Sequence, residues 1–203
     1  MKNYILKLGI VGLTILFFSC SKNEGEIKLN NFSGYYKIQS ISSSLPIDLN
    51  NDGLKTNNYL QEIKSNYTSF NGEIINFGYD NELWNNFAEV RPTKNQSNNT
   101  KFLDIRFPIQ RIDSIYQGNN SFVPLNMEYR KMYTAFIYKL TDNDVEIESD
   151  PFNQFEYNTI NNFEINRISI TEFEILFNFK VYDFTVNKYV ETRLKAKYEK
   201  TQE

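Results

Sequence analysis

Hydrophobic and polar residues alternate with a period of two along most of the chain from Phe32 onward, which is typical of half-buried β-strands. Near the C-terminus, charged residues alternate with the face formed by Val190, Thr192, Leu194, Ala196 and Tyr198. An earlier run has the same pattern, with one face formed by Phe173, Ile175, Phe177, Phe179 and Val181. Residues 182–189 supply the turn between these two runs, so we predict an antiparallel hairpin.

Weaker alternation predicts more short strands upstream, over residues 35–42, 73–77, 83–90, 103–109, 127–140, 145–149 and 163–170. Residues 141–144 read Thr-Asp-Asn-Asp, a tight-turn sequence that joins two of these runs into a second hairpin. Most predicted strands therefore follow one another as a meander.

One segment has a helical period instead, because Leu60, Ile63 and Tyr67 recur at spacings of three and four. Asn58 is the expected N-cap of this short helix, with Gln61 three residues after it. Eight or nine strands with one short helix after the first strand predict a single all-β domain over residues 31–203. We expect an antiparallel up-and-down β-barrel, and a β-sandwich is the alternative, because both arrangements protect strand edges.

The first predicted strand opens with Phe-Ser-Gly-Tyr-Tyr-Lys-Ile over residues 32–38, which resembles the Gly-x-Trp motif of lipocalin-like barrels, with Tyr36 at the Trp position. With this motif and its strand order, the chain resembles the lipocalin-like lipoproteins of Gram-negative bacteria. Barrels of about eight strands can hold one small ligand. The aromatic residues expected to line a cavity for a hydrophobic ligand are Tyr36, Phe107, Phe173, Phe177, Phe179 and Tyr198. The alternative is that these side chains fill the interior as a closely packed core.

The N-terminus has the pattern of a lipoprotein signal peptide. Lys2 and Lys7 flank the start of an uncharged apolar run over residues 8–18, which is too short to span a bilayer. The run ends in Phe-Phe-Ser-Cys, which resembles the lipobox of bacterial lipoproteins. The resemblance implies cleavage before Cys20 and lipid on its sulfur and amine, and the alternative is an ordinary thiol after a secretory signal.

We therefore expect residues 1–19 to be removed and residues 20–30 to form a lipidated, flexible tether. Ser21 follows the cysteine, and a serine there favours the outer membrane over retention at the inner membrane. The membrane, reached through this anchor, is thus the expected partner, on either the periplasmic or the surface face.

Composition excludes several classes of function. The chain has no histidine and one cysteine, so it lacks His-dependent nucleophiles, His-ligated metal sites and disulfides. Removal of residues 1–19 takes away two of 22 basic residues and none of 25 acidic ones, which leaves 20 against 25 and a net charge of −5. Such a chain lacks the basic surface that nucleic-acid binding requires, so no nucleic-acid partner is expected.

The sharpest local motif is Asp-Leu-Asn-Asn-Asp-Gly over residues 48–53, which matches the first half of an EF-hand calcium loop. The predicted calcium ligands are Asp48, Asn50, Asp52, Leu54 through its carbonyl, Thr56 and Glu62. Glu62 takes the part of the twelfth residue of such a loop, because Tyr59 at that position has no carboxylate. The alternative is an Asx-rich turn without an ion.

Paired carboxylates are the remaining route to catalysis in a chain without histidine. Glu146, Glu148 and Asp150 lie on one face of a predicted strand, but the apolar residues Val145 and Ile147 lie on the other face. We therefore expect these acids to face solvent and the protein not to be an enzyme.

The expected function is a non-catalytic, lipid-anchored lipocalin-like barrel of the outer membrane that binds a small hydrophobic ligand. The alternative is a calcium-stapled β-sandwich that contacts glycans or proteins at the cell surface.

Overall fold

The computed structural model describes residues 30–64, 67–69, 71–75, 87–92, 101–118, 121–141, 145–149 and 160–201. The predicted signal peptide (residues 1–19), Cys20 and the tether up to residue 29 lie outside the described residues, and so does Asp150. In the described part, no helix is both long enough and apolar enough to cross a membrane.

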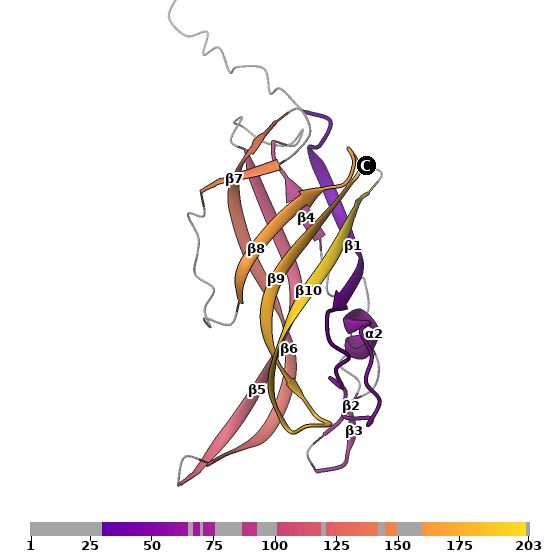
Figure 1. Cartoon of the computed structure of the whole chain (residues 1–203), viewed down its shortest axis with the longest axis vertical. Coiled ribbons are helices and arrows are strands. Elements are labelled where there is room, and N and C mark those ends of the chain that lie inside the picture. The colour runs from indigo at the N-terminus through magenta and orange to yellow at the C-terminus, as the bar shows by residue number, and fades with distance from the viewer. Residues whose placement is uncertain are drawn as a thin grey trace, which may run out of the picture.

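The structure is built almost wholly of strands (Figure 1). The N-terminal half contains β1 (Gly34–Ser43), α2 (Tyr59–Lys64), β2 (Tyr67–Thr68), β3 (Ile74–Ile75) and β4 (Phe87–Val90). The long central strands and the C-terminal strands are β5 (Phe102–Gly118), β6 (Ser121–Leu140), β7 (Val145–Ser149), β8 (Ile160–Arg167), β9 (Glu172–Asp183) and β10 (Lys188–Lys200).

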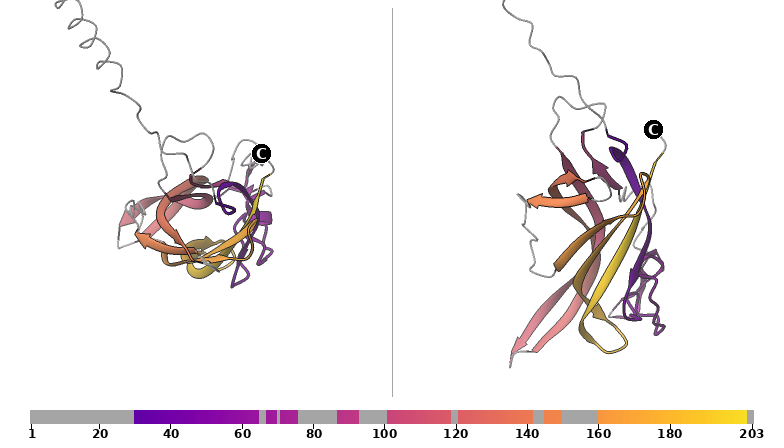
Figure 2. Two further views of the ribbon diagram at one scale, coloured as in Figure 1. Left: turned by 90° about the horizontal axis from the view of Figure 1, so that it is seen from above. Right: turned by 45° about the horizontal axis from the view of Figure 1, so that its top comes forward.

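Eight of these strands form one antiparallel sheet in the order β7-β6-β5-β4-β1-β10-β9-β8, and β2 pairs with β3 in a separate small sheet. The first strand lies between β4 and the last strand, which curls the sheet into a nearly closed barrel (Figure 2). The predicted antiparallel barrel with a short helix after its first strand is confirmed. The β-sandwich alternative is wrong, because the eight strands make one continuous sheet rather than two packed sheets.

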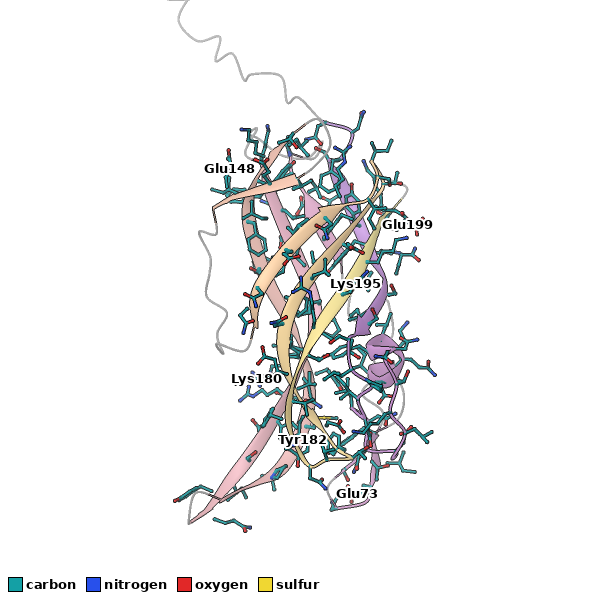
Figure 3. All side chains as sticks on the ribbon, in the orientation of Figure 1. Glu73, Glu148, Lys180, Tyr182, Lys195 and Glu199 are labelled. Atoms are coloured by element: carbon teal, nitrogen blue, oxygen red, sulfur yellow. The ribbon has the colours of Figure 1, made fainter. Side chains whose placement is uncertain are left out.

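The alternation of the sequence sets the two faces of the barrel wall. In β9, each residue of the predicted inner face from Phe173 to Val181 is buried. The outer face of the β9–β10 hairpin carries ion pairs, with Lys197 Nζ 2.9 Å from Glu172 Oε1 and Lys195 Nζ 3.5 Å from Glu174 Oε2. Lys195 and Glu199 project outward from β10 in Figure 3. The predicted C-terminal hairpin is therefore confirmed, with the turn shortened to residues 184–187.

Aromatic side chains fill the upper half of the barrel. The rings of Phe173 and Tyr198 stack with centroids 4.8 Å apart, and those of Phe107 and Phe177 lie 4.7 Å apart. Two of the buried tyrosine hydroxyls in this core have acceptors: Tyr36 donates to the Phe32 carbonyl at 2.7 Å and Tyr198 to the Arg106 carbonyl at 3.1 Å. Hydrogen bonding of these hydroxyls removes the penalty of burying them.

The lower half is covered by the segment between β1 and β4. Helix α2 begins where predicted, because the Asn58 side-chain oxygen accepts a hydrogen bond from the Gln61 amide at 3.1 Å. The helix buries Leu60 and Ile63 toward the barrel. Tyr67 was expected in the helix but lies in β2, where its side chain is buried all the same. Its apolar spacing therefore indicated burial and not helical structure.

Strands β5 and β6 are much longer than predicted, at 17 and 20 residues. Their far ends, beyond Ile112 in β5 and before Met127 in β6, leave the barrel as a projecting hairpin (Figure 1). Ile115, Tyr116 and Leu125 are exposed on this hairpin. The alternating pattern fails to predict this part because it reports a buried face, and a ribbon that leaves the barrel buries neither face.

Candidate functional site

A pocket of about 310 Å³ lies where the β5–β6 hairpin diverges from the β9–β10 hairpin. Its walls combine apolar and charged side chains from four strands. They are Ile109, Gln110, Arg111, Ile112 and Asp113 of β5, Arg130 of β6, Phe179 and Lys180 of β9, and Tyr189 of β10. Ile109 and Phe179 are buried, whereas Tyr189 is exposed, so the pocket runs from the barrel interior to solvent.

Gln110 determines where the two hairpins separate. Its Oε1 accepts a hydrogen bond from the Tyr182 amide at 2.7 Å, and its Nε2 donates to the Tyr182 carbonyl at 3.1 Å. The side-chain amide thus pairs with both backbone groups of Tyr182, as a neighbouring strand would. Because β5 and β9 are not neighbours in the sheet, this contact joins opposite walls of the barrel. Tyr182, one partner in this contact, lies in the lower part of Figure 3.

Cationic side chains surround the pocket. Arg111 Nε lies 3.2 Å from Asp113 Oδ1, and Glu128 Oε1 pairs with both Arg111 and Arg130. Lys180 is exposed and projects from β9 (Figure 3). Within the described ranges, no carboxylate lies within ion-pair distance of Lys180. The pocket therefore has three cationic side chains, against the two carboxylates of Asp113 and Glu128, which pair with the arginines.

The structure places one of the six predicted ligand-lining residues in this pocket, which is Phe179. The other five are buried against one another in the aromatic core above it: Tyr36, Phe107, Phe173, Phe177 and Tyr198. Their alternation correctly indicated that they face inward. The residues that form the rest of the pocket were missed, because the alternation of apolar inward-facing residues with polar outward-facing ones ends between Ile109 and Asp113.

The predicted calcium loop folds around its own polar side chains. The Gly53 amide donates to Asp48 Oδ2 at 3.1 Å, and the Asp52 amide donates to Asn50 Oδ1 at 3.1 Å. The Leu54 amide donates to Asp52 Oδ1 at 2.8 Å. Gly53 adopts a φ of 81°, which glycine accepts without strain.

Glu62 of α2 faces this loop. Its Oε2 accepts a hydrogen bond from the Leu49 amide at 2.9 Å, and its side chain is almost fully buried. Burial raises the pKa of Glu62 to about 7, and the nearby charges of Asp52 and Asp48 also raise it, against the lowering by the Leu49 amide. Asp48, Asn50, Asp52 and Glu62 are therefore brought together as predicted.

The remaining predicted ligands lie at the rim of the loop. Leu54 has an exposed side chain, and Thr56 pairs with Ile47 through backbone hydrogen bonds. The Thr56 hydroxyl accepts a hydrogen bond from the Asn58 amide at 3.1 Å. In the described part of the chain, no three His, Cys, Asp or Glu side chains are grouped so as to hold a metal ion by themselves.

Glu146 and Glu148, two of the three carboxylates considered for catalysis, are exposed on β7 as predicted. Of the two apolar residues predicted on the other face, Val145 is buried but Ile147 is exposed. Glu148 projects at the top of the barrel in Figure 3.

A buried ionic network on the outer side of β4 and β5 was missed. Glu89 and Asp104 are directly opposite in the β4–β5 register, and Arg91 Nη2 lies 3.1 Å from Glu89 Oε2 and 4.0 Å from Asp104 Oδ2. Arg106 lies 3.9 Å from Asp104, which also accepts a hydrogen bond from the Tyr133 hydroxyl. Burial raises the pKa of Asp104, while Tyr133 and the two arginines lower it. Two carboxylates balanced by two guanidinium groups indicate a structural network.

The chain matches no protein-family model, no curated protein and no solved structure. Function is therefore argued below from the geometry of the barrel, its pocket and its loop.

Proposed function

We propose that this protein is a non-catalytic, lipid-anchored lipoprotein of the Gram-negative outer membrane, and that its lipocalin-like barrel carries a small ligand in the pocket between its two hairpins. The sequence of residues 1–20 supports the anchor, and the antiparallel barrel supports the likeness to lipocalins. The observation that carries the ligand-binding part is the pocket of about 310 Å³ beside Phe179.

The size and lining of the pocket favour a small, partly apolar molecule. Pockets that bind small ligands begin at roughly 300 Å³ and combine apolar walls with a few polar groups. Ile109, Ile112, Phe179 and Tyr189 supply apolar and aromatic surface for the body of the ligand. Because the aromatic core above is filled by ring-to-ring packing, this lower site is the better candidate for a ligand than the upper half of the barrel.

The charges indicate which polar group the ligand carries. Arg111, Arg130 and Lys180 provide three cations at the pocket. Asp113 and Glu128 pair with the two arginines, so one positive charge, that of Lys180, remains in excess. A guanidinium group presents a fork of donors that matches carboxylate, sulfonate or phosphate oxygens. The proposed ligand is therefore an amphipathic anion whose acidic group lies toward these side chains.

Two fluorescent probes of similar size test this proposal. Anilinonaphthalene sulfonate is an amphipathic anion, and N-phenylnaphthylamine has nearly the same aromatic body without the charge. We expect the protein to bind the sulfonate more tightly. Lys180→Ala should weaken sulfonate binding by about threefold or more, because one favourable charge is lost, and leave the neutral probe unaffected.

Lys195→Ala is the matched control, because Lys195 lies on the outer face of β10 away from the pocket (Figure 3). It should leave the affinity for both probes unchanged. Ile112→Asp should weaken the binding of both probes, because it removes an apolar side chain from the wall of the pocket. Failure of the wild-type protein to bind either probe, or equal effects of the two lysine substitutions, would overturn the proposed ligand site and favour an interaction module.

A further inference from the structure

We propose that the loop formed by residues 48–56, together with Glu62, is a calcium site, and that Asp48 Oδ1 is the ligand atom around which it is built. This inference goes beyond the proposed ligand carriage and does not depend on it. Asp48, the first residue of the loop, and Glu62 are both buried, and side-chain oxygens recur in the loop at residues 48, 50 and 52.

The buried carboxylate of Asp48 is the observation that points to a ligand. Its side chain is 1% exposed, and only one of its two oxygens is used: Oδ2 accepts hydrogen bonds from the Gly53 amide and from the Thr185 hydroxyl, both at 3.1 Å. Oδ1 is buried without a hydrogen-bond partner. A buried carboxylate oxygen without a partner costs free energy, so a stable fold normally supplies one.

The surroundings of Asp48 show what kind of partner is missing. Asp52 and Glu62 add two more carboxyl groups near it: Glu62 accepts a hydrogen bond from the neighbouring Leu49 amide, and the charges of Asp52 and Asp48 both raise the pKa of Glu62. The nearest lysine in sequence, Lys55, pairs instead with Asp183 at 2.8 Å. Among the residues that the structure describes, no lysine or arginine lies within ion-pair distance of Asp48, Asp52 or Glu62. A small cation would balance this negative charge.

The chemistry of the donors selects calcium among common cations. All the candidate ligands are oxygens, from carboxylates, the Asn50 amide, the Thr56 hydroxyl and the Leu54 carbonyl. Hard oxygen donors suit calcium, which takes six to eight of them, whereas zinc prefers the histidine and cysteine side chains that this loop lacks. Because backbone and amide oxygens contribute, such a site does not require three grouped acidic side chains.

Binding at this loop would fasten it to the end of the barrel. The Phe184 amide donates to the Asp48 carbonyl at 3.0 Å, and Thr185 donates to the Asp48 side chain, so the turn between β9 and β10 already rests on this residue. Tyr129 of β6 donates to the Leu49 carbonyl at 3.3 Å. The ion is therefore structural: it would stabilise the contact of the 48–56 loop with both hairpins that form the pocket.

Thermal unfolding of the full-length protein in detergent, after treatment with a chelator, tests the site. We expect 1 mM calcium to raise the melting temperature by about 3 °C or more, as an affinity near 0.1 mM would require, and 1 mM magnesium to have a much smaller effect. An unchanged melting temperature, or an equal rise with magnesium, would overturn the proposal.

The Asp48→Asn variant makes the test specific, because asparagine keeps an acceptor for Gly53 and Thr185 but removes the unpaired charge. Without calcium we expect it to melt above the wild-type protein, and with calcium the order should reverse.

Asp52→Asn, at an exposed position, is a second variant that should lose the calcium shift without risk to folding. Asp113→Asn, on β5, is the control that should keep it. Retention of the full shift by both loop variants would overturn the proposal.

Discussion

At the scale of single residues, the buried carboxyl groups distinguish this protein from a plain β-barrel. Asp48 and Glu62 occupy the lower end of the fold, where a tyrosine-rich and aliphatic environment surrounds them, and Asp104 occupies the network on β5. Burial removes each carboxyl group from water, so each site needs a compensating partner. For Asp104 the partners are Arg91, Arg106 and Tyr133. For Asp48 and Glu62 we propose that the partner is calcium.

Glu62 leads to a prediction about pH in calcium-free buffer. Its pKa is about 7 in the folded protein against an ordinary value of 4.5, so between these values the folded state holds a proton that the unfolded state has released. Stability must therefore increase as the pH falls from 8 to 5, by at most about 3 kcal/mol from this group. We expect Glu62→Gln to lose this part of the pH dependence in urea unfolding with a chelator present.

Glu199→Gln is the control for this measurement, because Glu199 lies on the exposed outer face of β10. It should retain the wild-type slope of stability against pH. The same slope in Glu62→Gln would show that the Glu62 carboxyl group does not titrate in this range.

At the scale of elements, the two long hairpins determine where a ligand can bind. Strands β5 and β6 run together over almost their whole length, and β9 and β10 do the same, but the pairs touch each other at Gln110 and Tyr182. Above this contact the space between them is filled by side chains such as Phe107 and Phe177. The pocket lies beside this contact, because Gln110 itself lines it together with Phe179 and Lys180 of β9. Gln110 therefore lies between the aromatic core and the pocket.

We predict that Gln110→Ala weakens the contact between the β5–β6 and β9–β10 hairpins. The substitution leaves the buried amide and carbonyl of Tyr182 without their side-chain partners, which should lower the free energy of unfolding by about 1–3 kcal/mol. Hydrogen exchange at the Tyr182 amide should accelerate more than at other amides of β9. Gln39→Ala is the control, because Gln39 bonds only the exposed Glu199 on the outer face, and it should change neither quantity. Equal exchange rates in both variants would contradict this role of Gln110.

At the scale of the whole molecule, a nearly closed barrel is expected to stand on a membrane through a short tether. We predict that Cys20→Ser leaves the precursor without lipid. In a detergent phase partition the wild-type protein should enter the detergent phase, and the variant should shift away from it. The reason is that burial of each acyl methylene contributes about 0.8 kcal/mol of binding free energy. Ser19→Ala, which keeps a small residue before the cysteine, should behave as wild type. As a second measurement, cells are grown with radiolabelled palmitate. A wild-type protein that incorporates no label would contradict the proposed lipid anchor.

The sequence predicts much of the fold for a local reason. In a strand with one solvent-exposed face, hydrophobic and polar residues alternate and so reveal which residues point inward. The inner face of β9 and β10 could therefore be predicted directly. The Asn58 cap and the loop from Asp48 to Gly53 were also visible, because both depend on residues close together in the chain. The projecting part of β5 and β6 was missed because neither of its faces is buried.

What the sequence by itself determined, then, is the class of most elements, the face that β9 and β10 bury and the polar side chains of the loop over residues 48–56. The tertiary structure alone decided that β1 lies between β4 and β10, that Gln110 meets Tyr182, and that Thr185 covers Asp48. The physical reason is that alternation specifies a face and not a partner. Pairing across the barrel depends on the packing of side chains more than 70 positions apart in the sequence.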